Sequence, residues 1–277
     1  MKKNLMALWG LCVAAIITAL VLTSATFAWF TANREVGTDR VTARAGSNEL
    51  DLEVSQNGGE DFRAAANNEV PLKAQTAPLM PVSTADLKSF VYNSRTVDDF
   101  AEDFLPTQDE SFYYHDTIYL RAKAEGMPSG TKVALYLDKT PIVETLEGEL
   151  ITAARLGLTF DEASPVIITL SDVNEGTGNT RPGGVAIGDG QVLSYNSGNV
   201  TAAKDPAISL TDVQISPNDT PGKQPIATLE LKHLYAVDIF FYLEGCDPDC
   251  TSEKVAMDSA ALTLAFYGMM VSEEAGL

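Results

Sequence analysis

The residues best suited to chemistry gather in one short acidic loop near the C-terminus, the segment 244–253 (EGCDPDCTSE). Carboxylates and backbone carbonyls at close spacing are ligands that a hard cation such as Ca²⁺ prefers. The expected calcium ligands are Glu244, Asp247, Asp249 and Glu253. The spacing matches no EF-hand loop, and a solvated, cross-linked turn explains the acids equally well. Both interpretations stay open at this stage: a calcium site, or a turn with no cofactor.

The same loop carries Cys246 and Cys250, while the third cysteine, Cys12, lies in the apolar N-terminal segment. In an exported protein, an even pair of cysteines this close in sequence predicts a disulfide. A five-residue ring would fix the loop and stabilise the whole fold only modestly. A zinc or redox role is disfavoured, because the spacing is not Cys-x-x-Cys and no histidine lies nearby in sequence.

Outside this loop, the sequence offers few residues or motifs suited to catalysis. The chain has two histidines, His115 and His233, each in a strand-like segment. It contains no His-Glu-x-x-His helix, no Gly-x-Ser-x-Gly elbow and no phosphate-binding Gly-Lys-Ser/Thr motif. A Ser–His–Asp group assembled in space from distant residues is not visible in sequence and remains an alternative. The sequence predicts a non-catalytic protein with two ordinary strand histidines.

The N-terminus has the pattern of a targeting segment. Lys2 and Lys3 precede an apolar run, Leu5–Phe30, and no further charge follows until Arg34. A short basic start before an apolar stretch is typical of a secretory signal peptide. The run is also long enough to cross a bilayer as a helix, so an uncleaved anchor at residues 5–30 is the alternative.

Two features favour cleavage of this signal. Small residues gather at the end of the apolar run, and no basic stop-transfer cluster follows it. We expect a signal peptide at residues 1–28, cut between Ala28 and Trp29 or, alternatively, after Ala25, and an extracellular β domain at residues 29–277. The expected location is therefore outside the cell, secreted or at the cell surface.

The charge of the mature chain restricts its partners. The full sequence carries 19 basic and 38 acidic side chains, and removal of residues 1–28 leaves 17 against 38, a net charge of −21. This charge repels phosphate backbones and excludes nucleic-acid binding. It favours solubility, cation binding or pairing with a basic surface. About 250 residues fit one large β domain or two small ones.

Alternating strand patterns dominate this domain. Asp116–Ala124 places Ile118, Leu120 and Ala122 on one face, and a turn at residues 126–130 leads into Lys132–Asp138. We expect these two strands to form a hairpin. The segments Tyr235–Glu244 and Ala260–Met270 flank the cysteine loop and are expected to form a second one. Further predicted strands are Val41–Ala45, Glu49–Ser55, Ile151–Phe160, Val166–Leu170 and Ala227–Leu231.

Helical patterns are scarce, with two turns expected at Val97–Leu105. Residues 172–225 are rich in Gly, Pro, Asn and Asp and predict long surface loops between short strands. Many short strands with Gly/Pro turns predict a mainly β fold, a jelly-roll-like antiparallel β-sandwich with long loops and little helix.

The end of the apolar run, residues 26–33 (TFAWFTAN), leads through Val36–Val54 into a strand of the type Leu50-Asp51-Leu52-Glu53-Val54. This pattern resembles exported proteins of Gram-positive bacteria whose signal peptide is read by the peptidase SipW, the biofilm matrix protein TasA and the camelysins among them. The segment from Leu243 to Cys250 is also similar to one found in large exported proteins of this kind. The resemblance covers about the first 55 residues and the region 235–268.

The resemblance implies a jelly-roll-like sandwich that assembles into fibres by adding an N-terminal strand to a neighbouring subunit. The expected donor lies in residues 29–53, and its early apolar residues Trp29, Phe30, Val36 and Val41 would dock on an exposed sheet edge. Pairing of this segment within its own sheet is the equal alternative. Camelysin-like members are described as metalloproteases, an activity that no zinc motif here supports.

The expected function is thus a non-catalytic surface or matrix protein that self-associates or binds other surface proteins. The alternative is a monomeric or membrane-tethered binding module. Such a module would hold a cation, a glycan or a host protein on the loops of residues 172–225 or the acidic loop.

Overall fold

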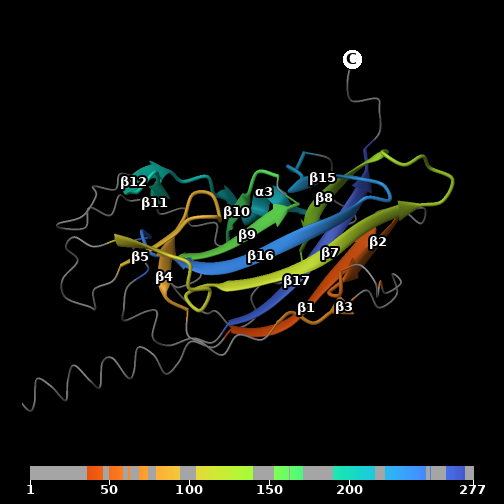
Figure 1. The fold of residues 1–277 in the computed structure, drawn as a ribbon. Helices are drawn as coiled ribbons and strands as arrows, with labels where there is room; N and C mark the ends of the chain where they lie inside the picture. Colours follow the sequence, from red (N-terminus) through yellow and green to blue (C-terminus); the bar gives the residue numbers. More distant parts are fainter. Residues whose placement is uncertain are drawn as a thin grey trace, which may run out of the picture.

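The computed structural model shows a mainly β protein with very little helix (Figure 1). The residues that the structure describes are 36–45, 50–58, 62, 69–73, 79–93, 104–139, 153–161, 163–170, 190–215, 222–247, 250 and 260–271. Within these ranges the strands form a six-stranded sheet, a nine-stranded sheet and a separate two-stranded one.

The six-stranded sheet has the order β14-β8-β17-β1-β3, with β15 also paired to β8. Its longest strands are β1 and β17, which run parallel to each other. The strands of this sheet are β1 (Val36–Ala45), β3 (Glu69–Val70), β8 (Lys132–Asp138), β14 (Gln214–Ile215), β15 (Ala227–Glu230) and β17 (Ala260–Met270).

The nine-stranded sheet is built around β16, which pairs antiparallel with both β7 and β9 and parallel with β4. The strands of this sheet are β2 (Leu50–Ser55), β4 (Pro81–Ser83), β5 (Phe90–Asn93), β6 (Phe104–Thr107), β7 (Tyr114–Ala124), β9 (Ala154–Phe160), β10 (Val166–Thr169), β13 (Ile208–Ser209) and β16 (Leu234–Glu244). Short helix α3 (Leu210–Val213) follows β13.

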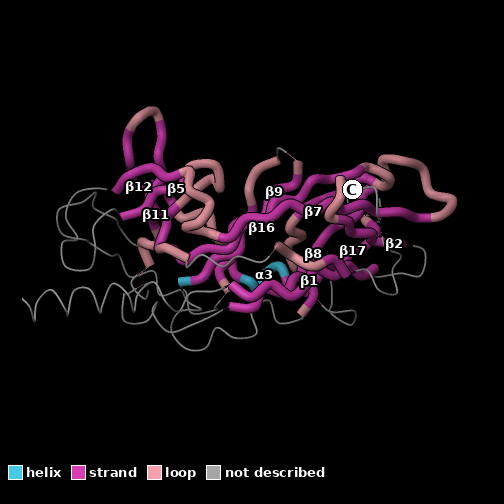
Figure 2. The backbone as a smooth tube through the Cα atoms, turned by 60° about the horizontal axis from the view of Figure 1, so that its bottom comes forward, coloured by secondary structure: helices cyan, strands magenta, loops and turns pink. Residues whose placement is uncertain are grey.

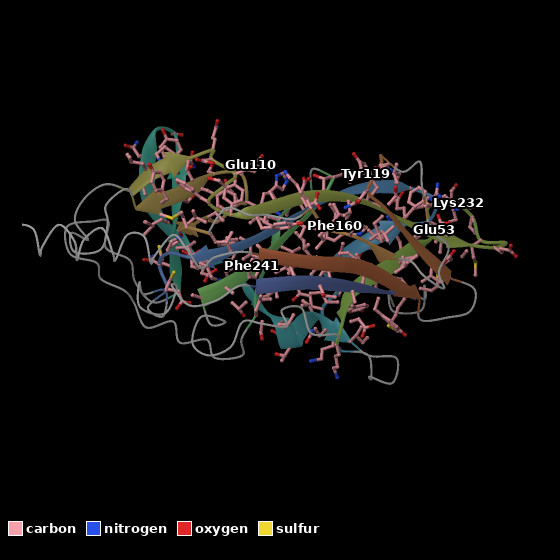
Figure 3. The ribbon with its side chains drawn as sticks, turned by 90° about the horizontal axis from the view of Figure 1, so that it is seen from below. Glu53, Glu110, Tyr119, Phe160, Lys232 and Phe241 are labelled. Atoms are coloured by element: carbon pink, nitrogen blue, oxygen red, sulfur yellow. The ribbon has the colours of Figure 1, made fainter. Side chains whose placement is uncertain are left out.

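The two large sheets face each other across one hydrophobic core. Alternation along the strands creates this core, because every second side chain of a strand points to the same side. Ile118, Leu120 and Ala122 of β7 are fully buried on the predicted face, and Leu264 and Phe266 of β17 approach from the other sheet. Phe160 and Phe241 belong to this core, and Figure 3 shows Glu110 and Tyr119 along one long side of the molecule.

Two glycines mark places where packing leaves no room for a side chain. A Cβ on Gly268 of β17 would lie 2.8 Å from Cδ1 of Leu52, in the facing strand β2. A Cβ on Gly157 of β9 would lie 2.6 Å from Cδ2 of Leu87, on the other side of the nine-stranded sheet. Contacts this short require a neighbouring atom to move, so these glycines set how closely the layers approach.

The outer face of the nine-stranded sheet carries a second, aromatic cluster. Phe90 stacks on Tyr113 with ring centroids 3.9 Å apart, and Phe240 and Tyr242 of β16 pack with them. The hairpin β11 (Gln191–Asn196) and β12 (Asn199–Lys204) projects at the same end of the molecule as β5 (Figure 2). The Oγ atom of Ser83 accepts a hydrogen bond from the backbone N–H of Leu193 and so ties this hairpin to β4.

The structure confirms the mainly β fold class and the predicted strands, within a few residues at their ends. The central region predicted as loops between short strands holds β11 to β14 and α3, while residues 171–189 and 216–221 lie outside the described ranges. The structure is consistent with the predicted β-sandwich, but its sheets are mixed as well as antiparallel. Within the described residues four strand pairs run parallel, β1–β17, β4–β16, β10–β13 and β8–β14, and the jelly-roll order is not confirmed.

Both predicted hairpins are also wrong. β7 and β8 belong to different sheets, and so do β16 and β17. The described turn after β7 carries the chain from the nine-stranded sheet to the six-stranded one, so β7 and β8 do not pair. Alternation of apolar and polar residues shows which face of a strand is buried. It does not show whether two such strands pair in one sheet or lie in opposite sheets that share a core, because the sequence pattern is the same in both cases.

The helix predicted at Val97–Leu105 is contradicted at its end, where Phe104 and Leu105 begin strand β6. Residues 97–103 lie outside the described ranges. β6 pairs antiparallel with β5, and these ladder hydrogen bonds outweigh the helical spacing of a few apolar residues.

Candidate functional site

The predicted signal peptide, its cleavage site at Ala28 and Trp29, and the apolar residue Phe30 all precede the first described residue, Val36. The alternative anchor at residues 5–30 lies there too. In the part of the chain that the structure describes, no helix is long and apolar enough to cross a membrane.

The remaining predicted donor residues, Val36 and Val41, lie in β1 and pair within their own chain. Val36 faces Ala260 and Val41 faces Leu264 in a parallel ladder that runs to Ala45 opposite Gly268. The ladder has one irregularity, between Thr38 and Arg40. The structure therefore shows the own-sheet alternative for this single chain.

We call the parallel ladder between β1 and β17 the seam. Fewer backbone pairs hold β1 in the sheet than hold β17. On its other side, and within the described residues, β1 pairs only through Val41 and Thr42, with the two-residue strand β3. By contrast, β17 also pairs antiparallel with β8, and its residues Leu262 and Leu264 are fully buried. The later part of the expected donor, Leu50–Glu53, belongs to β2 in the nine-stranded sheet. There it pairs with β7, and Leu52 is buried in the core.

At the acidic loop, the central group is a buried arginine that sequence reasoning did not single out. Arg155 of β9 is 6% exposed, and its Nη2 atom donates to Oδ2 of Asp247 at 3.0 Å. Burial disfavours the charge of the guanidinium, but Glu244 and Asp247 outweigh burial, and the pKa of Arg155 is raised. A single Arg in the otherwise apolar strand 154–160 was the signal that could have found it.

Glu244 ends β16 and points into the protein. Its Oε1 accepts a hydrogen bond of 3.0 Å from the backbone N–H of Cys246, and the residue is 2% exposed. Burial raises the pKa of Glu244 to about 7, against the opposing effects of Ser83 and Arg155. The carboxylate of Glu244 stabilises the turn, because its Oε1 atom accepts a hydrogen bond from the backbone of the turn itself.

This geometry disfavours calcium at Glu244 and Asp247, the two expected ligands that the structure describes. Glu244 and Asp247 bind the Cys246 N–H and Arg155 instead of converging on a shared position, and a neighbouring guanidinium repels a cation. Asp249 and Glu253 lie outside the described residues. No group of three or more ligand side chains that could hold a metal is found among the residues that are described.

The disulfide prediction is likewise not met, since the structure forms no bond between Cys246 and Cys250. The two side chains enter different hydrophobic clusters. Cys246 packs with Val91 and Leu193 and donates from Sγ to Oγ of Ser83 at 3.4 Å, whereas Cys250 belongs to the main core. The two cysteines are thus buried in different clusters, although they are close in sequence.

The structure places His115 in β7, as predicted, and His233 just before β16. His115 lies between Glu110 and Asp238, with its ring stacked on that of Phe240 at 4.5 Å. His233 is more exposed, and its Nε2 lies 3.1 Å from Oδ2 of Asp161.

Asp238 of β16 is the centre of the polar group around His115. Thr117 of β7 donates to its Oδ1 at 2.7 Å, and Thr159 of β9 donates to its Oδ2 at 3.1 Å. Contact with His115, followed by these two hydroxyls, lowers the pKa of Asp238 against the effect of burial. The register explains the group, because Thr117, Asp238 and Thr159 face one another on three adjacent strands.

Comparison of the chain with protein-family models, with curated proteins and with solved structures gives no match. The likeness to proteins with a SipW-type signal therefore remains an expectation from the sequence.

Proposed function

We propose that this protein is a non-catalytic subunit of an extracellular matrix or cell surface, exported by its N-terminal signal and assembling into fibres by β-strand addition. The observation that carries the proposal is the seam between β1 and β17, where the N-terminal strand of the chain completes a buried sheet in parallel register. In the fibre, β1 of one subunit would occupy this place in the next.

The seam suits exchange for three reasons. Parallel pairs are slightly less stable per residue than antiparallel ones, and the ladder is interrupted between Thr38 and Arg40. The outer edge of β1 pairs with β3 through Val41 and Thr42 alone among the described residues. An identical strand from a neighbour would restore every hydrogen bond, so exchange costs little at equilibrium.

The edge of β17 strongly requires a neighbouring strand. Without β1, the edge of β17 would present unpaired N–H and C=O groups along a strand whose side chains form the core. A neighbour's strand can satisfy these groups by β-augmentation. When each subunit donates one strand and accepts another, the contact is heterologous and does not close, so it grows a filament.

Deletion tests this proposal. The full chain and a variant lacking residues 29–40 behind the same signal are expressed, and the exported protein is examined by electron microscopy and sedimentation. We expect fibres from the intact protein and only small species from the variant. A matched deletion in the β7–β8 turn, residues 126–129, should leave assembly intact. Fibres of equal length from the variant lacking residues 29–40 would refute the role of this strand.

A further inference from the structure

Outside the seam, the polar group around His115 ties a surface segment to the centre of the nine-stranded sheet. Nδ1 of His115 lies 3.5 Å from Oε1 of Glu110, in the connection between β6 and β7, and Nε2 lies 3.6 Å from Oδ1 of Asp238. Stacking on Phe240 holds the ring between these two carboxylates. The imidazole thus has an acceptor on each side.

Only one protonation state fits both acceptors. A neutral imidazole has one N–H and one lone pair, so one ring nitrogen would face a carboxylate with its lone pair. The imidazolium ion carries N–H groups on both nitrogens and can serve Glu110 and Asp238 together. Nε2 is buried without a hydrogen bond, so its contact with Asp238 at 3.6 Å is a charge interaction, which only the imidazolium ion can make.

The segment that carries Glu110 covers the aromatic cluster. Tyr113 stacks on Phe90, and Phe112 meets Tyr92 edge to face at 4.9 Å. The backbone N–H of Met80 donates to the carbonyl of Phe112 at 2.9 Å. Loosening of residues 108–113 would therefore uncover aromatic side chains on the outer face of the sheet.

We propose that His115 is a proton-operated clasp, which in its doubly protonated form binds Glu110 and Asp238 at once and holds residues 108–113 on the sheet. When the ring loses a proton, one of the two contacts is lost. Asp238 is fixed by Thr117 and Thr159, so the contact with the more exposed Glu110 is the one released. The clasp is independent of the proposed fibre assembly.

The direction with pH follows from the charges. Contact with Asp238, opposed by burial and supported by Glu110, raises the pKa of His115 above its ordinary value. A raised pKa in the folded state means that the stabilisation is complete below the unfolded pKa of about 6.5 and is lost as the pH rises through the folded pKa. The segment is held at low pH and released as the pH rises through the raised pKa of His115.

The test follows the ring signals of His115 by NMR between pH 5 and pH 9 in the full chain, together with hydrogen exchange of the amides of residues 109–113. We expect His115 to titrate above the ordinary imidazole pKa of about 6.5. After correction for the intrinsic pH dependence, exchange of the segment should rise about two- to fivefold as His115 deprotonates, the size an exposed ion pair supports. Amides of β9 should show no such rise.

Glu110→Gln removes one acceptor charge at an exposed side chain and should not unfold the protein. It should lower the titration midpoint of His115 and abolish the extra exchange, whereas Glu125→Gln, an exposed change in the β7–β8 turn, should do neither. Two results would overturn the clasp. One is an unchanged titration midpoint of His115 in Glu110→Gln, and the other is a hydrogen-exchange rate of residues 109–113 that does not change when His115 deprotonates.

Discussion

At the scale of single residues, Arg155 decides what the acidic loop does. A guanidinium buried in β9 requires compensation. Asp247, in the loop after β16, supplies it by direct contact, and Glu244 at the end of β16 adds to it when ionised. Burying a charge without a partner costs several kcal/mol, so these acids act as structural partners of Arg155.

Removal of Asp247 should therefore destabilise the fold strongly. We expect Asp247→Ala to lower the free energy of unfolding by about 3 kcal/mol, at the lower end for a broken buried pair because Glu244 remains beside Arg155. Urea denaturation measures the change. Asp212→Ala, at an exposed position in α3, should change stability by less than about 0.5 kcal/mol. Equal effects of the two substitutions would contradict the account of the buried pair.

The raised pKa of Glu244 predicts a dependence of stability on pH. The folded protein holds this proton up to about pH 7, whereas the unfolded chain releases it near pH 4.5. Stability that depends on Glu244 is complete below pH 4.5 and falls as the pH rises to about 7. Glu244→Gln keeps an acceptor for the Cys246 N–H but does not titrate. The difference in unfolding free energy between wild type and variant should change across this window, and a constant difference would be the contrary result.

The sequence predicted the acids and cysteines of this loop as a feature, but not their use. Whether a carboxylate binds a cation or a guanidinium depends on a residue 92 positions away, since Arg155 and Asp247 meet only in the folded chain. The pairing of the cysteines is equally hidden from the sequence. Their spacing permits a disulfide, but in the folded chain each side chain is buried in a different hydrophobic cluster. Local spacing carries no information on such distant partners.

At the scale of elements, alternating patterns located the strands and their buried faces but not their neighbours. The side chains Ile118, Leu120 and Ala122 are buried as predicted, yet β7 pairs with β2 and β16 instead of β8. Pairing depends on backbone hydrogen bonds that are chemically alike in every strand. Only side chains that meet across the core, such as Leu52 opposite Gly268, distinguish one arrangement from another.

The close approach at Gly268 gives a direct check of the facing sheets. Gly268→Ala should destabilise the protein by about 1–3 kcal/mol, because the new methyl group meets the side chain of Leu52. The double variant Gly268→Ala/Leu52→Val should recover part of this loss, so that the two effects are not additive. Thermal or urea unfolding of both single variants and the double variant provides the cycle. Strict additivity would mean that these residues do not touch.

At the scale of the whole molecule, net charge opposes the association of subunits, whereas strand exchange favours it. The chain carries a net charge of −19, and subunits of like charge repel as they approach. Completion of the edge of β17 favours association at the same time. Salt should shift this balance, because it screens the repulsion and leaves the backbone pairing unaffected.

Fibre growth should consequently become faster with salt. We expect the growth rate, followed by light scattering at fixed protein concentration, to rise at least about twofold when the ionic strength is raised roughly tenfold, since repulsion between surface charges is screened. An uncharged crowding agent at matched osmolarity serves as the control. A rate that falls with salt would indicate assembly through opposite charges instead of strand addition.

The central claim, that β1 leaves its own chain during assembly, is tested most directly by locking it in place. Thr42 and Ala265 face each other in the ladder, and the double variant Thr42→Cys/Ala265→Cys would join β1 to β17 by a disulfide, whose pairing mass spectrometry verifies. We predict that the oxidised protein stays monomeric and that reduction restores fibres to the level of the wild type. Fibres from the oxidised, fully cross-linked protein would contradict the exchange of β1.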